Sequence, residues 1–132
     1  FAQKDELKAA KKALKSGNKV ETISNDLMVL FRPEIQPYLM SAFKHHPAQE
    51  IKSLQVPSLI IGGGADLQVS DADATILKQN AIKSSKLLII KDLNHVLKQV
   101  DPSDKTANMA TYNNGNLGLH PQFVKAMINF IK

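Results

Sequence analysis

Two short apolar runs, separated by a stretch with helical spacing, most constrain what this chain can fold into. The runs span residues 56–61 and 86–90, and three glycines follow the first of them. Neither run alternates apolar with polar residues, and unbroken runs of this kind are typical of parallel strands buried on both faces of a sheet. The helical stretch between them follows Asp71, which can cap a helix there. We therefore predict a βαβ unit, whose right-handed crossover leaves the carboxyl ends of both strands at one edge of the sheet.

Helical spacing dominates the residues before that unit. Apolar residues recur at intervals of three and four over residues 4–16 and 33–44. Pro37 is tolerated in the first turn of the second stretch, because the N–H that it lacks needs no acceptor there. A shorter helix is predicted after Asn25 and Asp26, which can cap its start. The first part of the chain is therefore predicted to be all-helical.

The end of the chain is predicted to hold a loop and one more helix. Residues 101–118 are polar and include an Asn-Asn-Gly step, which is typical of a loop. Pro121 then begins a helix whose apolar stripe should be buried. That stripe comprises Phe123, Val124, Met127, Ile128 and Ile131. These patterns divide the chain into a helical segment, residues 1–50, and an α/β core, residues 51–132.

Two loops leave the same edge of the predicted sheet, and each carries one chemically useful side chain. Asp66 follows the glycines after the first strand, and His95 follows the second strand. Functional groups in open parallel sheets gather at such carboxyl ends. Neighbouring strands lie about 4.8 Å apart, so that a carboxylate on one loop can reach an imidazole on the next. A carboxylate bonded to one ring nitrogen fixes the tautomer and leaves the other nitrogen to take a proton from a nucleophile. We predict that Asp66 and His95 form such a pair.

The sequence around these two residues resembles the last third of the α/β-hydrolases, in their lysophospholipase and serine-aminopeptidase-like group. The likeness lies in VPSLIIGGGADLQV at 56–69, in LNHVLK at 93–98, and in RPEIQPYL at 32–39, which looks like the end of that family's lid. In that family the serine, the acid and the histidine of the triad follow one another in this order. The resemblance implies an α/β fold class. The chain would be the C-terminal part of an α/β-hydrolase, with helical lid segments in residues 1–50 ahead of the core.

The same resemblance implies a function. Asp66 corresponds to the acid of the triad and His95 to its base, in a serine hydrolase that cleaves a carboxylic ester or, as the less favoured choice, an amide by acyl transfer. The expected substrate is a small ester or acyl compound, and this chemistry needs no metal and no cofactor. Asp92, close to His95, is expected to be a solvated loop residue. Glycines 62–64 are expected to form a tight strand exit rather than a nucleotide-binding loop.

The chain departs from the family pattern at the nucleophile. None of its nine serines lies in a G-x-S-x-G elbow, and the early strands with their oxyanion-hole loop are missing too. The first residues resemble neither a start methionine nor a signal peptide. We expect the chain to be a fragment of a longer parent protein and to be inactive toward esters by itself.

A non-catalytic role is the alternative from another functional class. An α/β-hydrolase-like fragment can serve in binding or assembly, because the strand at 56–61 would present an unpaired edge without its earlier neighbours. We expect that edge to attract a second chain that carries the N-terminal half, or a swapped copy of the same chain.

Composition excludes several other classes. The chain has no cysteine, which rules out disulfides, thiolate zinc sites and a cysteine nucleophile. Its net charge of +5 comes without arginine clusters or interleaved aromatic residues, so we predict no nucleic-acid partner. No apolar run is long enough for an integral membrane segment. His45, His46 and His120 lack carboxylate or cysteine partners at ligand spacing, and we expect them at the surface rather than on a metal.

Overall fold

The computed structural model describes residues 2–132 and divides them into two compact units. The division falls between His46 and Pro47. It lies slightly ahead of the boundary expected at residue 50, because residues 47–50 belong to the same helix (Pro47–Ser53) as Ile51, which packs in the hydrophobic core of the second unit.

The first unit contains helices α1 (Ala2–Lys15), α2 (Asn25–Phe31) and α3 (Gln36–Ala42) and the 3₁₀ turn η1 (Pro33–Ile35). The apolar faces of the helices meet in a core that comprises Ala10, Leu14, Leu27 and Phe31. Partly buried apolar side chains, among them Leu39 and Phe43, pack against this core. Burial of these apolar faces is the main stabilising contribution to short helices of this kind.

Two helix starts in the first unit differ from the prediction. Helix α2 begins at Asn25 itself, so Asn25 and Asp26 lie within the helix and the residue at its N-cap is Ser24. The single helix predicted over residues 33–44 is divided into η1 and α3. The reason is local, since Pro37 has no N–H to donate to the carbonyl four residues earlier.

The second unit contains both strands. Its elements are α4 (Pro47–Ser53), β1 (Leu59–Gly63), α5 (Asp71–Asn80), β2 (Lys86–Ile90), α6 (Lys105–Ala110), the 3₁₀ turn η2 (Thr111–Asn113) and α7 (Pro121–Ile131). Its core comprises Ile51, Ile60 and Ala74, with Leu77, Ala81 and Leu87 packed against them. Within residues 2–132, no helix is both long and apolar enough to cross a membrane.

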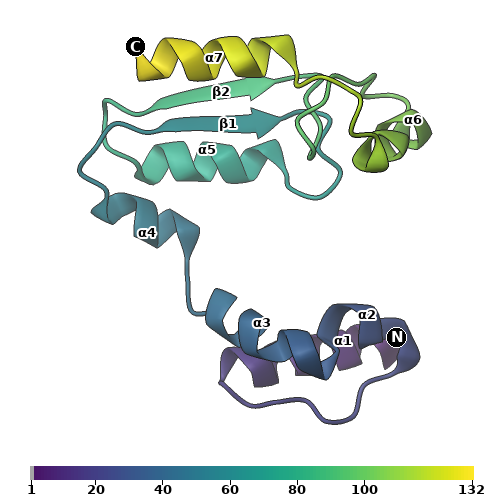
Figure 1. Ribbon diagram of the computed structural model, residues 1–132. Helices are drawn as coiled ribbons and strands as arrows, with labels where there is room; N and C mark the ends of the chain where they lie inside the picture. The colour runs from purple at the N-terminus through teal and green to yellow at the C-terminus, as the bar shows by residue number, and fades with distance from the viewer. Residues whose placement is uncertain (1) are drawn as a thin grey trace. The chain divides into compact units, whose positions relative to one another are not determined.

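The predicted βαβ unit is present, and its strands are parallel. Leu59 pairs with Lys86 at one end of the sheet and Gly63 with Ile90 at the other. Helices α5 and α7 lie on opposite sides of the two strands, and α6 lies beyond their carboxyl ends (Figure 1). This arrangement of helices around a small parallel sheet is compatible with an α/β fold. It brings the loops after β1 and β2 to one edge.

Strand β1 begins and ends later than predicted. The expected strand spanned residues 56–61, but β1 begins at Leu59 and continues through two glycines. Val56 is exposed, and Pro57 has no N–H with which to join the ladder. Helix α5 also differs in its cap: Ser70 Oγ accepts from Ala72 N at 3.2 Å, whereas the predicted cap Asp71 is the first helical residue.

The polar stretch at 101–118 is not the continuous loop that was predicted. It contains α6 and η2, and α6 begins at a clear capping residue, since Asp104 Oδ1 accepts from Ala107 N at 2.8 Å. The asparagine-rich composition indicated a loop, whereas Asn108 lies within α6 and its side chain is buried.

Helix α7 begins at Pro121 as predicted, but its apolar stripe is not buried as predicted. Among the described residues, α7 has no fully buried side chain, and Ile128 and Ile131 are 47% and 77% exposed. A continuous apolar face left open in this way is typical of a surface that another element or chain contacts.

Candidate active site

The loops after β1 and β2 are joined to each other at the carboxyl edge of the sheet. Gly64 N donates to Ile90 O at 2.8 Å, and Ala65 N donates to Leu93 O at 3.1 Å. Gly63 and Gly64 permit this approach, because a Cβ at Gly63 would lie only 2.4 Å from Leu93 O. The glycines therefore act as the close-packed strand exit expected from the sequence, and they bring the next residue of each loop into range.

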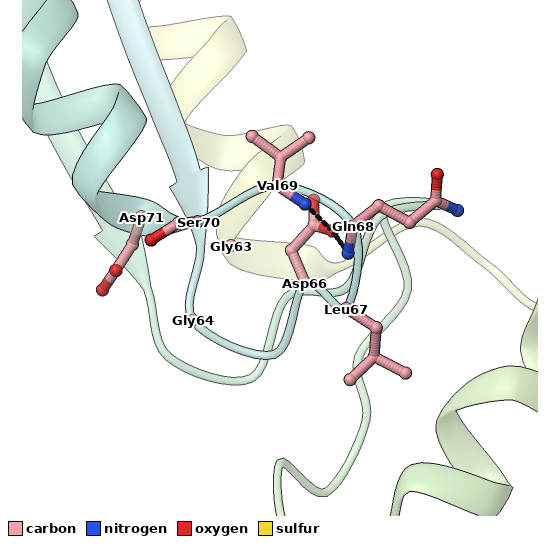
Figure 2. A pocket seen from close by; sticks show the side chains of 8 residues that line it. All are labelled: Gly63, Gly64, Asp66, Leu67, Gln68, Val69, Ser70 and Asp71. Atoms are coloured by element: carbon pink, nitrogen blue, oxygen red, sulfur yellow. Dashed lines mark hydrogen bonds between the residues drawn. The ribbon is translucent and has the colours of Figure 1, made fainter. Parts of the chain in front are cut away.

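Asp66 and His95 lie together at this edge. Asp66 Oδ2 is 3.0 Å from His95 Nδ1. The other carboxylate oxygen, Oδ1, accepts from the backbone N–H groups of Gln68 at 2.8 Å and Val69 at 3.0 Å (Figure 2). These two bonds form a local turn that holds the carboxylate in place. The structure thus brings the two predicted site residues into direct contact.

The ionisation of Asp66 favours this contact. Partial burial raises the pKa of the carboxyl, but hydrogen bonds from Val69 N and Gln68 N and the neighbouring His95 outweigh it, so the pKa lies below its ordinary value. Asp66 is therefore a carboxylate at neutral pH, and its Oδ2 accepts a hydrogen bond from His95 Nδ1–H. This bond leaves His95 Nε2 as the nitrogen available to another group, on a side chain that is 37% exposed, against 13% for Asp66.

Two side chains that the sequence did not single out support His95. The ring of Tyr112 stacks beside the imidazole, with ring centroids 6.3 Å apart and planes 15° from parallel. The buried side chain of Asn94, immediately before His95, bonds to Asn108. Both partners belong to the segment predicted as loop. The one available signal was Asp104, a good capping residue ahead of residues with helical propensity.

A second histidine–aspartate pair lies nearby and corrects two expectations. His120 Nε2 is 3.0 Å from Asp92 Oδ1, and Asp92 Oδ2 accepts from Gln99 Nε2 at 2.7 Å. Asp92 is thus not simply a solvated residue. The hydrogen bond from His120, with a further one from Gln99, lowers the pKa of Asp92. His120 is not a surface residue either, since its side chain is 5% exposed.

The two histidines differ in the use of their ring nitrogens. His120 Nδ1 accepts from Gln122 N at 3.1 Å at the start of α7, so Nε2 carries the proton and donates to Asp92. Both nitrogens of His120 are therefore occupied, and the residue anchors α7. In His95 only Nδ1 is bonded to a carboxylate, and the side chain is partly exposed, which leaves Nε2 for the proton transfer that a general base performs.

No metal centre is found in the described part of the chain. Within residues 2–132, no group of three or more histidine, cysteine, aspartate or glutamate side chains is placed to hold a metal ion. His45 and His46 are exposed.

An open hollow of about 390 Å³ adjoins the loop that carries Asp66. It lies between the end of β1 and the start of α5, and its lining includes Gly64, Asp66, Ser70 and Asp71 (Figure 2). Ser70 is committed to capping α5. His95 is not among the residues that line this hollow.

The comparisons with known proteins give one relative. The chain is 34% identical over 105 residues to the esterase EstD of Thermotoga maritima, in an alignment that takes in 70% of this chain and 25% of that protein. The chain thus spans about a quarter of the length of this curated relative. No protein-family model matches the chain. No solved structure matches it. The chain is therefore similar to part of an esterase.

Proposed function

We propose that this chain is the C-terminal part of an α/β-hydrolase of the lysophospholipase and serine-aminopeptidase-like group, and that the whole protein hydrolyses carboxylic esters. The observation that carries the proposal is the Asp66 Oδ2–His95 Nδ1 contact of 3.0 Å, on a histidine side chain that is 37% exposed. It gives an acid and a base in the chain order of that family. The similarity to an esterase supports the same reaction.

The proposed reaction assigns one role to each residue. His95 Nε2 takes the proton of a serine hydroxyl as its oxygen attacks the ester carbonyl, and then gives that proton to the departing alcohol. Water hydrolyses the acyl-enzyme by the same proton transfers in reverse order. Asp66 keeps the proton on Nδ1 and stabilises the imidazolium that forms. The nucleophile and the oxyanion-hole donors would come from a part of the protein outside this sequence.

The first unit fits the role of a lid. The first unit precedes the α/β core in the chain. Residues 32–39 resemble the end of the lid of the α/β-hydrolases, and residues 1–50 are proposed to be helical lid segments. In a whole enzyme, part of its apolar surface would line the pocket for a small ester or acyl substrate.

A direct experiment compares this chain with the longest protein that contains it. Both are assayed with a p-nitrophenyl ester and are then treated with a serine-directed phosphonate. The proposal expects hydrolysis by the longer protein only, and loss of that activity after covalent labelling of one serine. Inactivity of the longer protein would contradict the proposal.

A role in assembly is the second candidate, and the open face of α7 favours it. Ile128 and Ile131 of α7 are exposed, and the sheet has only two strands, whose outer edges are unpaired among the described residues. Such edges and apolar faces attract further strands or chains. This candidate expects the chain to dimerise, or to bind a chain with the N-terminal half. A clean monomer on gel filtration that binds no hydrophobic dye would count against it.

A further inference from the structure

We propose that Asn108 is a positioning residue that clamps the loop of Asp66 to the loop of His95. Its carboxamide makes one hydrogen bond to each loop. Nδ2 donates to Ala65 O at 2.7 Å, and Oδ1 accepts from Asn94 Nδ2 at 2.9 Å. Ala65 immediately precedes Asp66, and Asn94 immediately precedes His95. The proposal rests on the function proposed above.

Burial gives these bonds their strength. Asn108 and Asn94 are 2% and 1% exposed. In such surroundings water does not replace a lost partner, and the group left unpaired becomes strongly unfavourable. Thr111 adds a second support from the same segment, because Oγ1 accepts from Asn94 Nδ2 at 2.7 Å and donates to Asn108 O at 2.7 Å.

The turn that presents His95 depends on the other end of Asn94. Asn94 Oδ1 accepts from Lys98 N at 2.8 Å, and Asn94 N donates to Lys98 O at 3.1 Å. Between them Leu97 has a φ of 62°, in the left-handed region that a leucine rarely adopts. Such a conformation persists only where surrounding contacts fix it. Asn94 therefore connects the shape of the turn to the clamp.

A clamp of this kind controls the distance between acid and base. The two loops come from different strands, and Asp66 and His95 meet through a single hydrogen bond. A misplacement of about 1 Å at a reacting group can lower a rate by about a hundredfold. The carboxamide of Asn108 bonds to Ala65 and Asn94 rather than to Asp66 or His95, so it acts through the placement of the pair.

The test replaces Asn108 by aspartate, which has almost the same shape but cannot donate to Ala65 O. Asn116→Asp is the matched control, because it makes the same change at an exposed position of the same 101–118 segment. The first readout is nuclear magnetic resonance of the 132-residue chain. It follows the low-field signal of the His95 Hδ1 proton and the titration of the Asp66 carboxyl. The second readout is ester hydrolysis by the longest protein that contains the chain.

We expect Asn108→Asp to remove or broaden the Hδ1 signal and to raise the pKa of Asp66 toward its ordinary value, while Asn116→Asp changes neither. In the longer protein, kcat should fall by about tenfold to a hundredfold with KM within about twofold. If Asn108→Asp fails to fold, Thr111→Val takes its place, since it removes only one of the two acceptors of Asn94 Nδ2 and should move the same signals less.

An unchanged Hδ1 signal and Asp66 titration in a folded Asn108→Asp or Thr111→Val chain would overturn the clamp. The resonance readout needs no activity. If the longer protein is inactive but Asn108→Asp still removes or broadens the Hδ1 signal, the proposed function is refuted and the clamp stands. If the longer protein is active but Asn108→Asp leaves the Hδ1 signal and the Asp66 titration unchanged, the clamp is refuted and the proposed function stands.

Discussion

Replacing Gly63 by alanine should separate the two loops of the site. The added Cβ would lie 2.4 Å from Leu93 O and 3.2 Å from Leu93 C. The obstacle is backbone, which cannot rotate away as the end of a side chain can. Leu93 O also accepts from Ala65 N, one of the bonds that joins the loops. The methyl group and this hydrogen bond therefore compete for the same space.

The size of the effect follows from that contact. Real Cβ atoms do not approach other heavy atoms closer than 3.0 Å. Leu93 O must therefore retreat by more than half an ångström. Overpacking of this kind lowers the free energy of unfolding by roughly 1–3 kcal/mol. A weakened loop bond adds about 1 kcal/mol. A loss of about 2–4 kcal/mol should lower the Tm by roughly 10 °C or more for a unit of this size.

The assay is thermal unfolding followed by circular dichroism, with two other glycines as controls. Gly62→Ala should have a smaller effect, because its nearest obstacle is Ile89 Cδ1, the flexible end of a side chain, at 2.7 Å. Gly115→Ala should stay within about 0.5 kcal/mol of wild type, since nothing in the described structure lies within 4 Å of its Cβ. Equal Tm values for Gly63→Ala and Gly115→Ala would refute the close approach of the loops.

Three further predictions concern the side chains around the site. The folded-state pKa of Asp66 lies below the ordinary value of 3.8, so its ionised form stabilises the fold above that pH and this contribution is lost as the pH falls through the folded-state pKa. The stability difference between wild type and Asp66→Asn, measured by urea unfolding, should therefore shrink below pH 3.8, and a constant difference would disprove the linkage. His120→Ala should lower the free energy of unfolding by roughly 1–2 kcal/mol because α7 loses its cap, and urea unfolding should detect this; a change below about 0.5 kcal/mol would argue against the anchor. Tyr112 Oη is buried without a hydrogen-bond partner in the described part of the chain, so Tyr112→Phe should leave stability unchanged or raise it by up to about 1 kcal/mol, while a clear loss in the same assay would reveal a partner.

The strands and the Asp66–His95 contact were predictable because they follow from local patterns. Unbroken apolar runs indicated parallel strands, and parallel strands bring the loops that follow them to one edge. The second strand lies over residues 86–90 as predicted. The start of β1 was harder to predict from the sequence. Pairing begins at Leu59 opposite Lys86, and no local signal marks that position.

The surroundings of the pair could not be predicted, because they depend on contacts between distant parts of the chain. His120 is buried through Asp92, which lies 28 residues earlier, and a lone histidine in the sequence gives no sign of that partner. Asn108 reaches Ala65 across 43 residues. The stripe of α7 was recognised correctly as apolar, but whether it is covered depends on what packs against it, and helical periodicity does not contain that information.

Ester hydrolysis by the longest protein that contains this chain, compared between wild type and His95→Ala, tests the central claim most directly. The His120→Ala variant is the matched control, because it removes the histidine of the other pair. We predict that His95→Ala lowers kcat by several orders of magnitude with an unchanged unfolding midpoint, whereas folded His120→Ala retains most of its activity. Undiminished hydrolysis by His95→Ala would contradict the assignment of His95 as the base.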